Sequence, residues 1–269
     1  MISLIQYPGG KFYMLEDIKE IFSKSEKIIS IVDVFGGSGK VLTTLKSKVK
    51  IYNDINSNLV NFFTQFKEHK KEILEKFDYI LNSRELFEKY KEKTNDNLEN
   101  AFRFLYTNIL SFNGNCKSYT YSNKTQKSLR LLNIKDAIDE FYNEIKYWTI
   151  ENLDFKEIIK KYDSENTFFY LDPPYHNITD LYDYNLNDQD YIEMKQSLDN
   201  IKGKYLLNIN EDEFVLKLFG KPQKRKEFVN FGINGRDGIK TKRIELFYYS
   251  NSINYNELQM SNSLNDFED

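Results

Sequence analysis

The sequence predicts an α/β fold whose sheet-forming part is interrupted by an inserted, mostly helical segment. Apolar runs of strand length alternate with helical patterns in the first 58 residues and again after residue 148. Between them lie roughly 90 residues in which apolar side chains recur mainly at helical spacing. Near the end, residues 228–247 alternate around an Asn-Gly turn, which is typical of a β-hairpin.

The first half of the sheet is predicted from two strands, residues 30–35 and 49–52, with a helix beginning at Lys40. The glycine-rich turn Gly36-Gly37-Ser38-Gly39 stands between the first strand and that helix, where a ligand can approach the backbone at a helix N-terminus. Taken alone, this turn is equally typical of a tight structural connection. Asp54 ends the second strand, about where an acid binds a ribose in dinucleotide folds, although it could also cap a helix. Together the two features favour a nucleoside-bearing ligand.

The remaining elements follow from periodicity and turn signals. A helical pattern runs from Leu59 to about Leu110, residues 112–132 indicate loop or hairpin, and an apolar stripe from Ile134 to Trp148 predicts another helix. Strands are then expected near 149–153, 167–171 and 204–209, with helices near 155–161, 187–201 and 211–218. We therefore predict a catalytic domain from residues 1–58 and 149–250, an inserted domain at 59–148, and a polar acidic tail at 251–269.

Composition excludes several classes of protein. The chain has one cysteine, Cys116, which rules out an internal disulfide and fits a reducing cytoplasm. No stretch has the length of a membrane span, and the start lacks the layout of a signal peptide, so no membrane partner is expected. His69 and His176 are far apart and have no cysteine partners, which argues against a zinc site, and no metal is expected.

The net charge of −3 conceals an uneven distribution. Residues 251–269 hold four acids and no Lys or Arg, so residues 1–250 carry about +1. Residues 202–243 hold 11 Lys/Arg against five Asp/Glu. Such an excess is more often a solvated surface, and becomes a candidate phosphate-binding face only with other signs of nucleic acid.

The tetrapeptide Asp172-Pro173-Pro174-Tyr175 directly follows the apolar run Phe168–Leu171. Two prolines cannot donate to a sheet ladder, so the strand ends here and leaves a carboxylate and a ring on a stiff loop. This pair suits methylation of an exocyclic nucleobase amine, which is a poor nucleophile. Asp172 and the carbonyl of Pro173 could accept its hydrogens while Tyr175 stacks on the base. A purely structural role is possible but does not explain the acid.

Four segments in this order, YPGGK, DVFGGSG, YND and YLDPPY, resemble motifs of S-adenosylmethionine-dependent DNA adenine N6-methyltransferases. The most similar group is the Dam-like (D12) class, which contains the DNA adenine methylases of bacteria and phages. The resemblance spans residues 6–247. It implies a Rossmann-like methyltransferase sheet with a C-terminal β-hairpin, an inserted target-recognition domain, S-adenosylmethionine as cofactor, double-stranded DNA as partner, and base flipping.

The resemblance also implies roles for individual residues. It assigns cofactor contacts to Tyr7, Lys11, Phe35, Gly36, Gly37, Ser38, Gly39, Asp54, Asp154, Phe155 and Asp172. Among these, Asp54 is expected on the ribose and Asp154-Phe155 on the cofactor's adenine, although Asp154 could simply cap the next helix. Catalysis is assigned to Asp172, Pro173, Pro174 and Tyr175.

For DNA, the stretch from Phe104 to Gly114 is similar to a family segment in the target-recognition domain. Ile109 stands where the family has Arg, a later family segment is missing, and Lys117 lies near a base-reading Arg of relatives, so the GATC target is not carried over. The C-terminal hairpin resembles the last family motif. The predicted DNA contacts are Asn113, Lys117, Tyr119, Lys224, Arg225, Lys226, Arg236, Lys240, Lys242 and Arg243.

The sequence discriminates between several related activities. Cytosine C5 methylation is excluded, because it needs a cysteine nucleophile and Cys116 has no matching context. Cytosine N4 methylation uses a similar loop that more often begins with Ser, so Asp172 favours adenine. Methylation of RNA adenine or of a protein amide uses similar loops, but these classes generally lack the helical insertion with its FNG segment. DNA binding without turnover is disfavoured by the intact acid and aromatic positions, Asp172 and Tyr175. The target sequence, a cognate restriction endonuclease, the oligomeric state and the biological role are not predicted.

Overall fold

A computed structural model of the chain describes residues 4–6, 12–120, 134–176, 184–231 and 240–253. Its seven strands form one sheet in the order β3-β2-β1-β4-β5-β7-β6. The strands are β1 (Ser30–Asp33), β2 (Val49–Asn53), β3 (Thr149–Glu151), β4 (Thr167–Leu171), β5 (Lys204–Asn210), β6 (Lys224–Phe231) and β7 (Lys240–Tyr249). The five strands β1 to β5 are parallel, while β7 is antiparallel to both β5 and β6. The predicted α/β fold is confirmed.

The strand order places a topological switch between β1 and β4. From β1 the chain builds outward through β2 and β3, and then returns to add β4 and β5 on the other side. In open α/β sheets, ligands bind outside the carboxyl ends of the strands at such a point. All five residues of β4 are buried, as expected for a central parallel strand covered on both faces.

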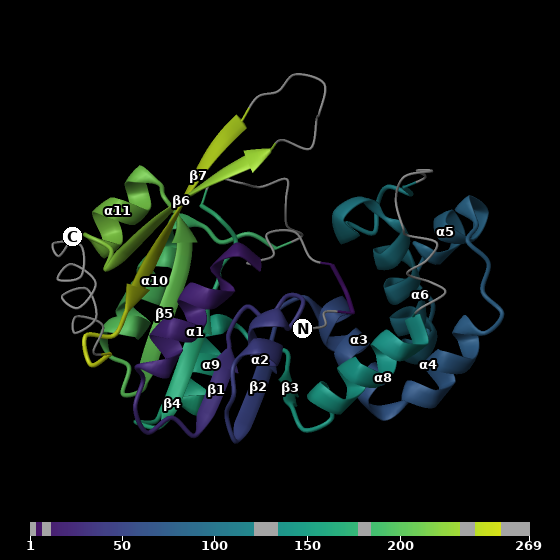
Figure 1. The fold of residues 1–269 in the computed structure, drawn as a ribbon, viewed down its shortest axis with the longest axis horizontal. Coiled ribbons are helices and arrows are strands. Elements are labelled where there is room, and N and C mark those ends of the chain that lie inside the picture. The colour runs from purple at the N-terminus through teal and green to yellow at the C-terminus, as the bar shows by residue number, and fades with distance from the viewer. Residues whose placement is uncertain (1–3, 7–11, 121–133, 177–183, 232–239, 254–269) are drawn as a thin grey trace, which may run out of the picture.

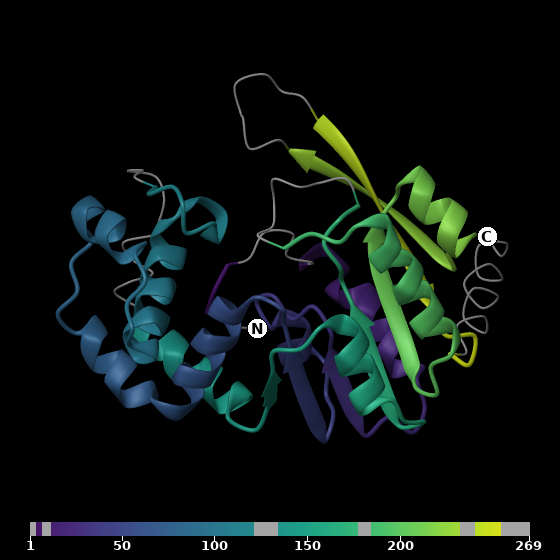
Figure 2. The same ribbon diagram turned by 180° about the vertical axis from the view of Figure 1, so that it is seen from behind.

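Helices cover both faces of the sheet. One face carries α1 (Leu15–Ser23) and α2 (Lys40–Thr44), and the other carries α9 (Phe155–Tyr162), α10 (Asp188–Asp199) and α11 (Glu213–Phe219), as Figures 1 and 2 show from opposite sides. Strand residues alternate between the two cores, with Phe168 and Tyr170 on the α1 side and Phe169 and Leu171 on the α9 side.

A helical lobe lies at the β3 edge of the sheet (Figure 1). It contains α3 (Ser57–Glu68), α4 (Lys70–Phe77), α5 (Arg84–Tyr90), α6 (Asn97–Leu110) and α8 (Ile134–Ile145). The long helical pattern of residues 59–110 is thus divided into four helices. Short 3-10 turns lie at Phe12–Met14 and Phe112–Gly114, and an antiparallel bridge pairs Ser111 with Tyr119.

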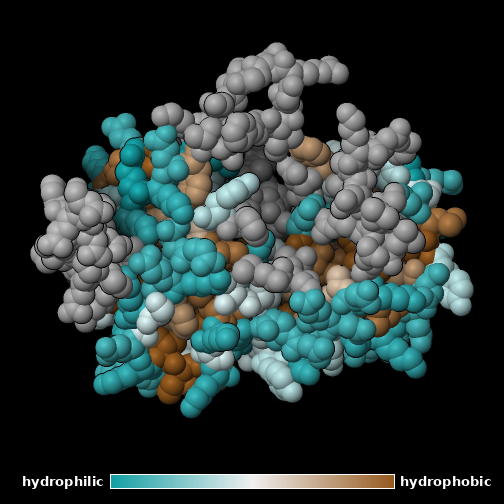
Figure 3. Space-filling view, viewed as in Figure 1, coloured by the Kyte–Doolittle hydropathy of each residue, from teal (hydrophilic) through white to brown (hydrophobic). Residues whose placement is uncertain are grey.

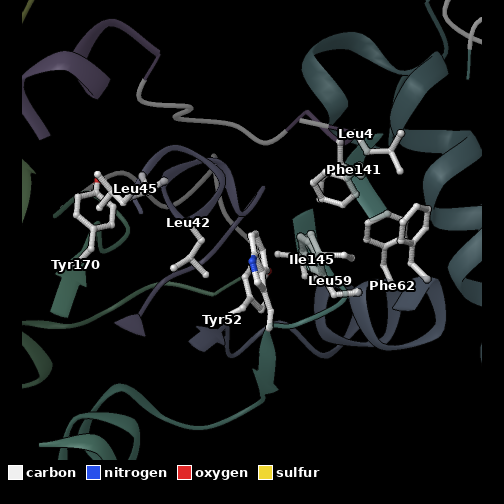
Figure 4. Close-up of a cluster of buried hydrophobic side chains, with 14 of the residues drawn as sticks. Leu4, Leu42, Leu45, Tyr52, Leu59, Phe62, Phe141, Ile145 and Tyr170 are labelled. Atoms are coloured by element: carbon white, nitrogen blue, oxygen red, sulfur yellow. The ribbon is translucent and has the colours of Figure 1, made fainter. Parts of the chain in front are cut away.

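One hydrophobic core joins the lobe to the sheet. Figure 4 shows side chains of Leu42 and Tyr52 from the sheet side continuing into Leu59, Phe141 and Ile145 of the lobe. The space-filling view is mainly hydrophilic, with apolar residues in separate groups (Figure 3). Because the core crosses the predicted boundary at residue 58, α3 packs as part of both units.

The C-terminal hairpin extends past the edge of the parallel strands. Asn210, the last residue of β5, pairs with Glu245 of β7, which in turn pairs with Lys226 of β6. Residues 227–231 and 240–244 therefore pair with each other past the end of β5 and extend beyond the parallel strands (Figure 1). The predicted turn at residues 234–238 lies outside the described residues. No helix in the described part of the chain is long and apolar enough to cross a membrane.

Candidate active site

The glycine loop after β1 adopts backbone conformations and close contacts that require glycine. Gly37 and Gly39 adopt positive φ angles of 50° and 69°, which favour glycine. Gly36 lies against the ring of Tyr52, where an added Cβ would stand 2.3 Å from a ring carbon. The Tyr52 hydroxyl donates to the Gly37 carbonyl at 2.8 Å. The loop is therefore fixed to the strand beside it.

Asp54 braces this loop from the end of β2. Its Oδ2 accepts from the backbone N–H of Gly37 at 2.9 Å, and its Oδ1 accepts from the N–H of Asn56 at 2.8 Å. The side chain is buried, and burial raises its pKa against the opposing effect of these hydrogen bonds. The helix cap itself is Asn56, whose side chain accepts from Asn58 at the start of α3. Each carboxylate oxygen accepts one of these hydrogen bonds and can accept another. The expected contact with a ribose is therefore compatible with this geometry and stays a prediction.

The Asp154-Phe155 pair lies next to the glycine loop. Asn53 links them, because its Nδ2 donates to the Val34 carbonyl at 2.9 Å while its Oδ1 accepts from the Leu153 N–H at 2.9 Å. Asp154 caps α9 by accepting from Lys156 N–H. The capping role is confirmed; the adenine contact stays a prediction.

Phe155 is buried with its ring centroid 6.1 Å from that of Phe35. The structure therefore brings four of the predicted cofactor segments to one end of the sheet: the glycine loop, the end of β2, the start of α9 and the loop after β4. Tyr7 and Lys11, also predicted to contact the cofactor, lie outside the described residues.

The loop after β4 is held on both sides. Tyr175 is 6% exposed, and its hydroxyl donates to Oε1 of Glu245 on β7 at 2.5 Å. Burial, followed by the charge of Glu245, raises the pKa of Tyr175, so the phenol stays protonated. The hydroxyl of Tyr191 on α10 donates to the Pro174 carbonyl. The loop thus has a fixed conformation, with Asp172 partly exposed at its start.

Sequence reasoning missed two buried acids near this loop. Asp33 ends β1 with 1% exposure, and its Oδ1 has no hydrogen-bond partner among the described residues. Burial raises the pKa of Asp33 well above its usual range, and the charges of Asp172 and Asp54 raise it further. Glu245 is 3% exposed. The available signal was a single acid within each apolar strand, Ser30–Phe35 and Ile244–Phe247.

Three predicted DNA contacts on β6 are engaged in ion pairs. Lys224 and Lys226 both contact the carboxylate of Asp17 on α1, with Lys224 Nζ 2.7 Å from Oδ1. Arg225 makes two contacts with Glu211, at 2.6 and 3.0 Å. These pairs anchor the base of the hairpin, so the three side chains have structural partners that the local charge excess did not predict.

The other predicted DNA contacts lie elsewhere. Arg243 on β7 is exposed, two residues from Glu245, and its charge acts on Tyr175. Lys117 is exposed in the helical lobe. Tyr119 donates to Asn82 Oδ1 at 2.8 Å, and the Arg84 guanidinium lies 4.8 Å from its ring centroid.

The backbone of Asn113 is in the 3-10 turn Phe112–Gly114, and those of Lys240 and Lys242 are in β7. The side chains of these three residues, and all of Arg236, lie outside the described part of the chain.

The family-like stretch at the end of α6 has a structural role. Asn108 of α6 accepts from the Gln6 N–H at 2.8 Å and donates to the carbonyls of Gln6 and Gly114. It thus ties the lobe to the segment just before Tyr7. Gly114 has φ 70°, and an added Cβ would stand 2.3 Å from the Gln6 carbonyl oxygen.

Comparisons with known proteins place these features in a family. Residues 7–230 match the family model described as D12 class N6 adenine-specific DNA methyltransferase. The chain is 25% identical over 195 residues to the modification methylase StsI of Streptococcus sanguinis, covering 64% of this chain and 28% of that protein. It is 30% identical over 122 residues to the DNA adenine methylase of Escherichia coli K12, covering 43% of each.

A third relative is matched over most of its length. The chain is 21% identical over 227 residues to the type II methyltransferase M.CviBI of Paramecium bursaria Chlorella virus NC1A, covering 81% of this chain and 86% of that protein. The chain spans less than half the length of the first two relatives.

Proposed function

The chain belongs to the D12 class of N6 adenine-specific DNA methyltransferases, and from this premise we propose that it transfers a methyl group from S-adenosylmethionine to N6 of an adenine in duplex DNA. The observation that carries the proposal is the position of Asp172 and Tyr175. They follow β4 at the topological switch beside the braced glycine loop, where a donor and a base can meet.

The charges at this end of the sheet fit the proposed cofactor. Burial raises the pKa of Asp33, and the nearby charges of Asp172 and Asp54 raise it further. A ligand with an ammonium and a sulfonium group would relieve this repulsion, and Oδ1 of Asp33, which has no partner among the described residues, offers an acceptor. When bound, S-adenosylmethionine supplies an electrophilic methyl group. Phe35, Gly36, Gly37, Ser38 and Gly39, with Asp54, Asp154, Phe155, Tyr7 and Lys11, would hold it.

In this proposal the residues of the loop after β4 bind different parts of the target adenine. Asp172 and the Pro173 carbonyl accept the two amine hydrogens, which turns the nitrogen lone pair toward the methyl group. The Pro174 carbonyl already accepts from Tyr191, so the loop need not reorganise to do this. No proton has to be removed before methyl transfer, because the neutral amine is the nucleophile. The new N–C bond forms as the C–S bond of the donor breaks with both electrons going to sulfur, which leaves as a neutral thioether, and the cationic N6 then releases one proton to Asp172 or to solvent.

Tyr175 stacks on the adenine in this proposal. Its hydroxyl bond to Glu245 fixes the orientation of the ring, and with 6% of the residue exposed, base entry includes uncovering one ring face. A paired adenine cannot present its amine to the donor, so the base is flipped out of the duplex. The extended hairpin and the helical lobe lie on either side of this edge of the sheet and would contact the DNA (Figure 1).

The direct test is incorporation of labelled methyl groups into duplex DNA, RNA and protein, with long-read mapping of N6-methyladenine in the DNA. We expect methylation of duplex DNA at adenine within one recognition sequence. Asp172→Ala should abolish transfer while DNA affinity stays within about threefold, because phosphate contacts dominate affinity. Incorporation into RNA or protein instead of DNA, or full turnover by Asp172→Ala, would contradict the proposal.

A further inference from the structure

His176 directly follows residues 172–175, the loop after β4 that we call the catalytic loop. Its ring is held between two carboxylates. Its Nδ1 lies 2.9 Å from Oδ1 of Asp212, and its Nε2 lies 2.9 Å from Oδ1 of Asp188. The residue is 7% exposed. Asp212 is the N-cap of α11, and Asp188 is the first residue of α10. The ring thus joins the catalytic loop to the starts of two helices.

Hydrogen-bond chemistry determines the proton count of this arrangement. A neutral imidazole has one N–H donor and one acceptor nitrogen, whereas an ionised carboxylate only accepts. Two carboxylates at both ring nitrogens are therefore satisfied together only when the ring carries both protons. Each contact is then a charge-assisted hydrogen bond, which is stronger than a neutral one.

The groups around the ring keep it in this position. The Phe214 ring is stacked on it at 4.5 Å with an interplanar angle of 17°, and the Tyr191 ring meets it edge-on at 5.5 Å. Among the described residues, the titratable groups in contact with it include Asp188 and Tyr191 of α10 and Asp212 of α11. These described neighbours therefore hold the ring through two hydrogen bonds and two aromatic contacts.

We propose that His176, carrying both ring protons, is a positioning residue that sets the conformation of the catalytic loop. The proposal rests on the proposed methyltransferase function. His176 is bonded to Tyr175 through the backbone and so restrains its position. Tyr191, which packs against the His176 ring, donates to the Pro174 carbonyl. Removing one proton breaks one of the two carboxylate bonds and leaves an imidazole lone pair facing a carboxylate. The loop then loses an anchor, and turnover falls as pH rises.

The proton count can be measured without any activity. The chain has two histidines, so long-range ¹H–¹⁵N correlation of the imidazoles gives two ring systems, and His69→Gln assigns them. We expect both nitrogens of His176 to be protonated in the folded protein at neutral pH. A single neutral tautomer at that pH would overturn the proposal.

Asp188→Asn tests the proton requirement. The amide can donate to Nε2, so a neutral ring satisfies both neighbours and the loop keeps its anchor. We expect this variant to retain turnover at alkaline pH. In the wild type, turnover should decline over the same pH range in which the NMR signals show loss of a proton from His176. Glu193→Gln is the matched control. Glu193 lies on the same helix as Asp188 but pairs with Lys156 rather than with His176, so this variant should keep the wild-type pH profile. An unchanged profile in Asp188→Asn would contradict the proposal.

His176→Phe tests the positioning role. Phe keeps a ring on Phe214 but loses both carboxylate bonds, so kcat should fall about 10- to 100-fold with a much smaller change in KM for DNA. Thermal denaturation checks that the variant is folded, and the NMR and Asp188→Asn experiments stand if it is not. Absence of methyl transfer in the wild type would refute the proposed function alone, because the ring protonation is measured separately. A folded His176→Phe with normal kcat would refute the positioning role alone.

Discussion

At the scale of single residues, the site depends on acids whose partners are far away in sequence. Asp54 contacts Gly37, 17 residues earlier, and Tyr175 contacts Glu245, 70 residues later. Such pairs determine what each predicted site residue can do. Two predictions about substitutions follow from them.

Asp54→Ala should weaken binding of S-adenosylmethionine by about 1.5–3 kcal/mol, since it removes charge-assisted hydrogen bonds that hold the glycine loop. Because Asp54 braces the loop through the Gly37 N–H and is also proposed to accept from the ribose, part of the loss should persist with the 2′-deoxyribose analogue of the cofactor. Calorimetric titration of both proteins with both ligands gives this double-mutant cycle. A penalty that disappears with the 2′-deoxy ligand would show that Asp54 acts through a ribose hydroxyl instead.

Glu245→Leu should lower kcat about tenfold or more, because it leaves the buried Tyr175 hydroxyl without its acceptor and frees the ring to reorient. Glu245→Gln is the matched control, since its amide oxygen can still accept from the phenol and turnover should stay close to wild type. Steady-state methyl transfer measures both. Equal losses in the two variants would indicate that the charge of Glu245, not its acceptor, is required.

At the scale of elements, the hairpin combines an anchored base with an extended end. Asp17 of α1 receives Lys224 and Lys226 at the base, while Arg243 is exposed at the level where the strands pass the sheet edge. We therefore expect the basic residues of the hairpin to divide into structural ones at its base and DNA-binding ones toward its end. Stability and DNA binding should separate along it.

Asp17→Asn should reduce the free energy of unfolding by about 1 kcal/mol, because two lysines lose their partner. The lysine contacts lower the pKa of Asp17 although burial opposes them, so its contribution is present at neutral pH and is lost as pH falls through this lowered pKa. Urea denaturation at neutral and acidic pH measures the difference. Glu16→Gln, which disrupts an exposed pair with Lys19 on the same helix, should have little effect at either pH.

Arg243→Ala should weaken DNA binding and reduce the slope of log affinity against log salt by about 1, as expected for loss of one phosphate contact. Arg225→Ala is the control, because Arg225 already pairs with Glu211. Fluorescence anisotropy over a range of salt concentrations compares them. An effect of Arg225→Ala as large as that of Arg243→Ala would mean that the ion pair opens on DNA.

Local sequence pattern predicted most elements but not their long-range partners. The strands at 167–171 and 204–209 and the helices after 155 and 187 were found because periodicity and turn residues are local signals. The pairing of Asp17 with β6, of Asp54 with Gly37 and of His176 with Asp188 depends on how distant elements pack, which no spacing records. The short helix α1 was also missed, and its role became clear only through the lysines that it receives.

At the scale of the whole molecule, the helical lobe and the sheet share one core around the only tryptophan. Trp148 is 1% exposed, and its ring is stacked near Phe63 of α3 and Tyr52 of β2, at 6.2 and 6.3 Å. Gly39 of the glycine loop lies against this cluster, where an added Cβ would stand 3.0 Å from the Trp148 ring. Packing in the lobe therefore bears directly on the loop that would hold the cofactor.

This shared core predicts that the two units unfold together. Trp148 fluorescence reports the junction, and far-UV circular dichroism reports helices of both units, so their urea transitions should coincide. Phe63→Ala should shift both by about 3–5 kcal/mol, because it opens a cavity between α3 and β2. Phe87→Ala is the comparison variant. It also removes a buried ring, from a cluster with Tyr119, but leaves the packing between α3 and β2 intact. Two separated transitions in the wild-type chain would show that the lobe unfolds as an independent domain.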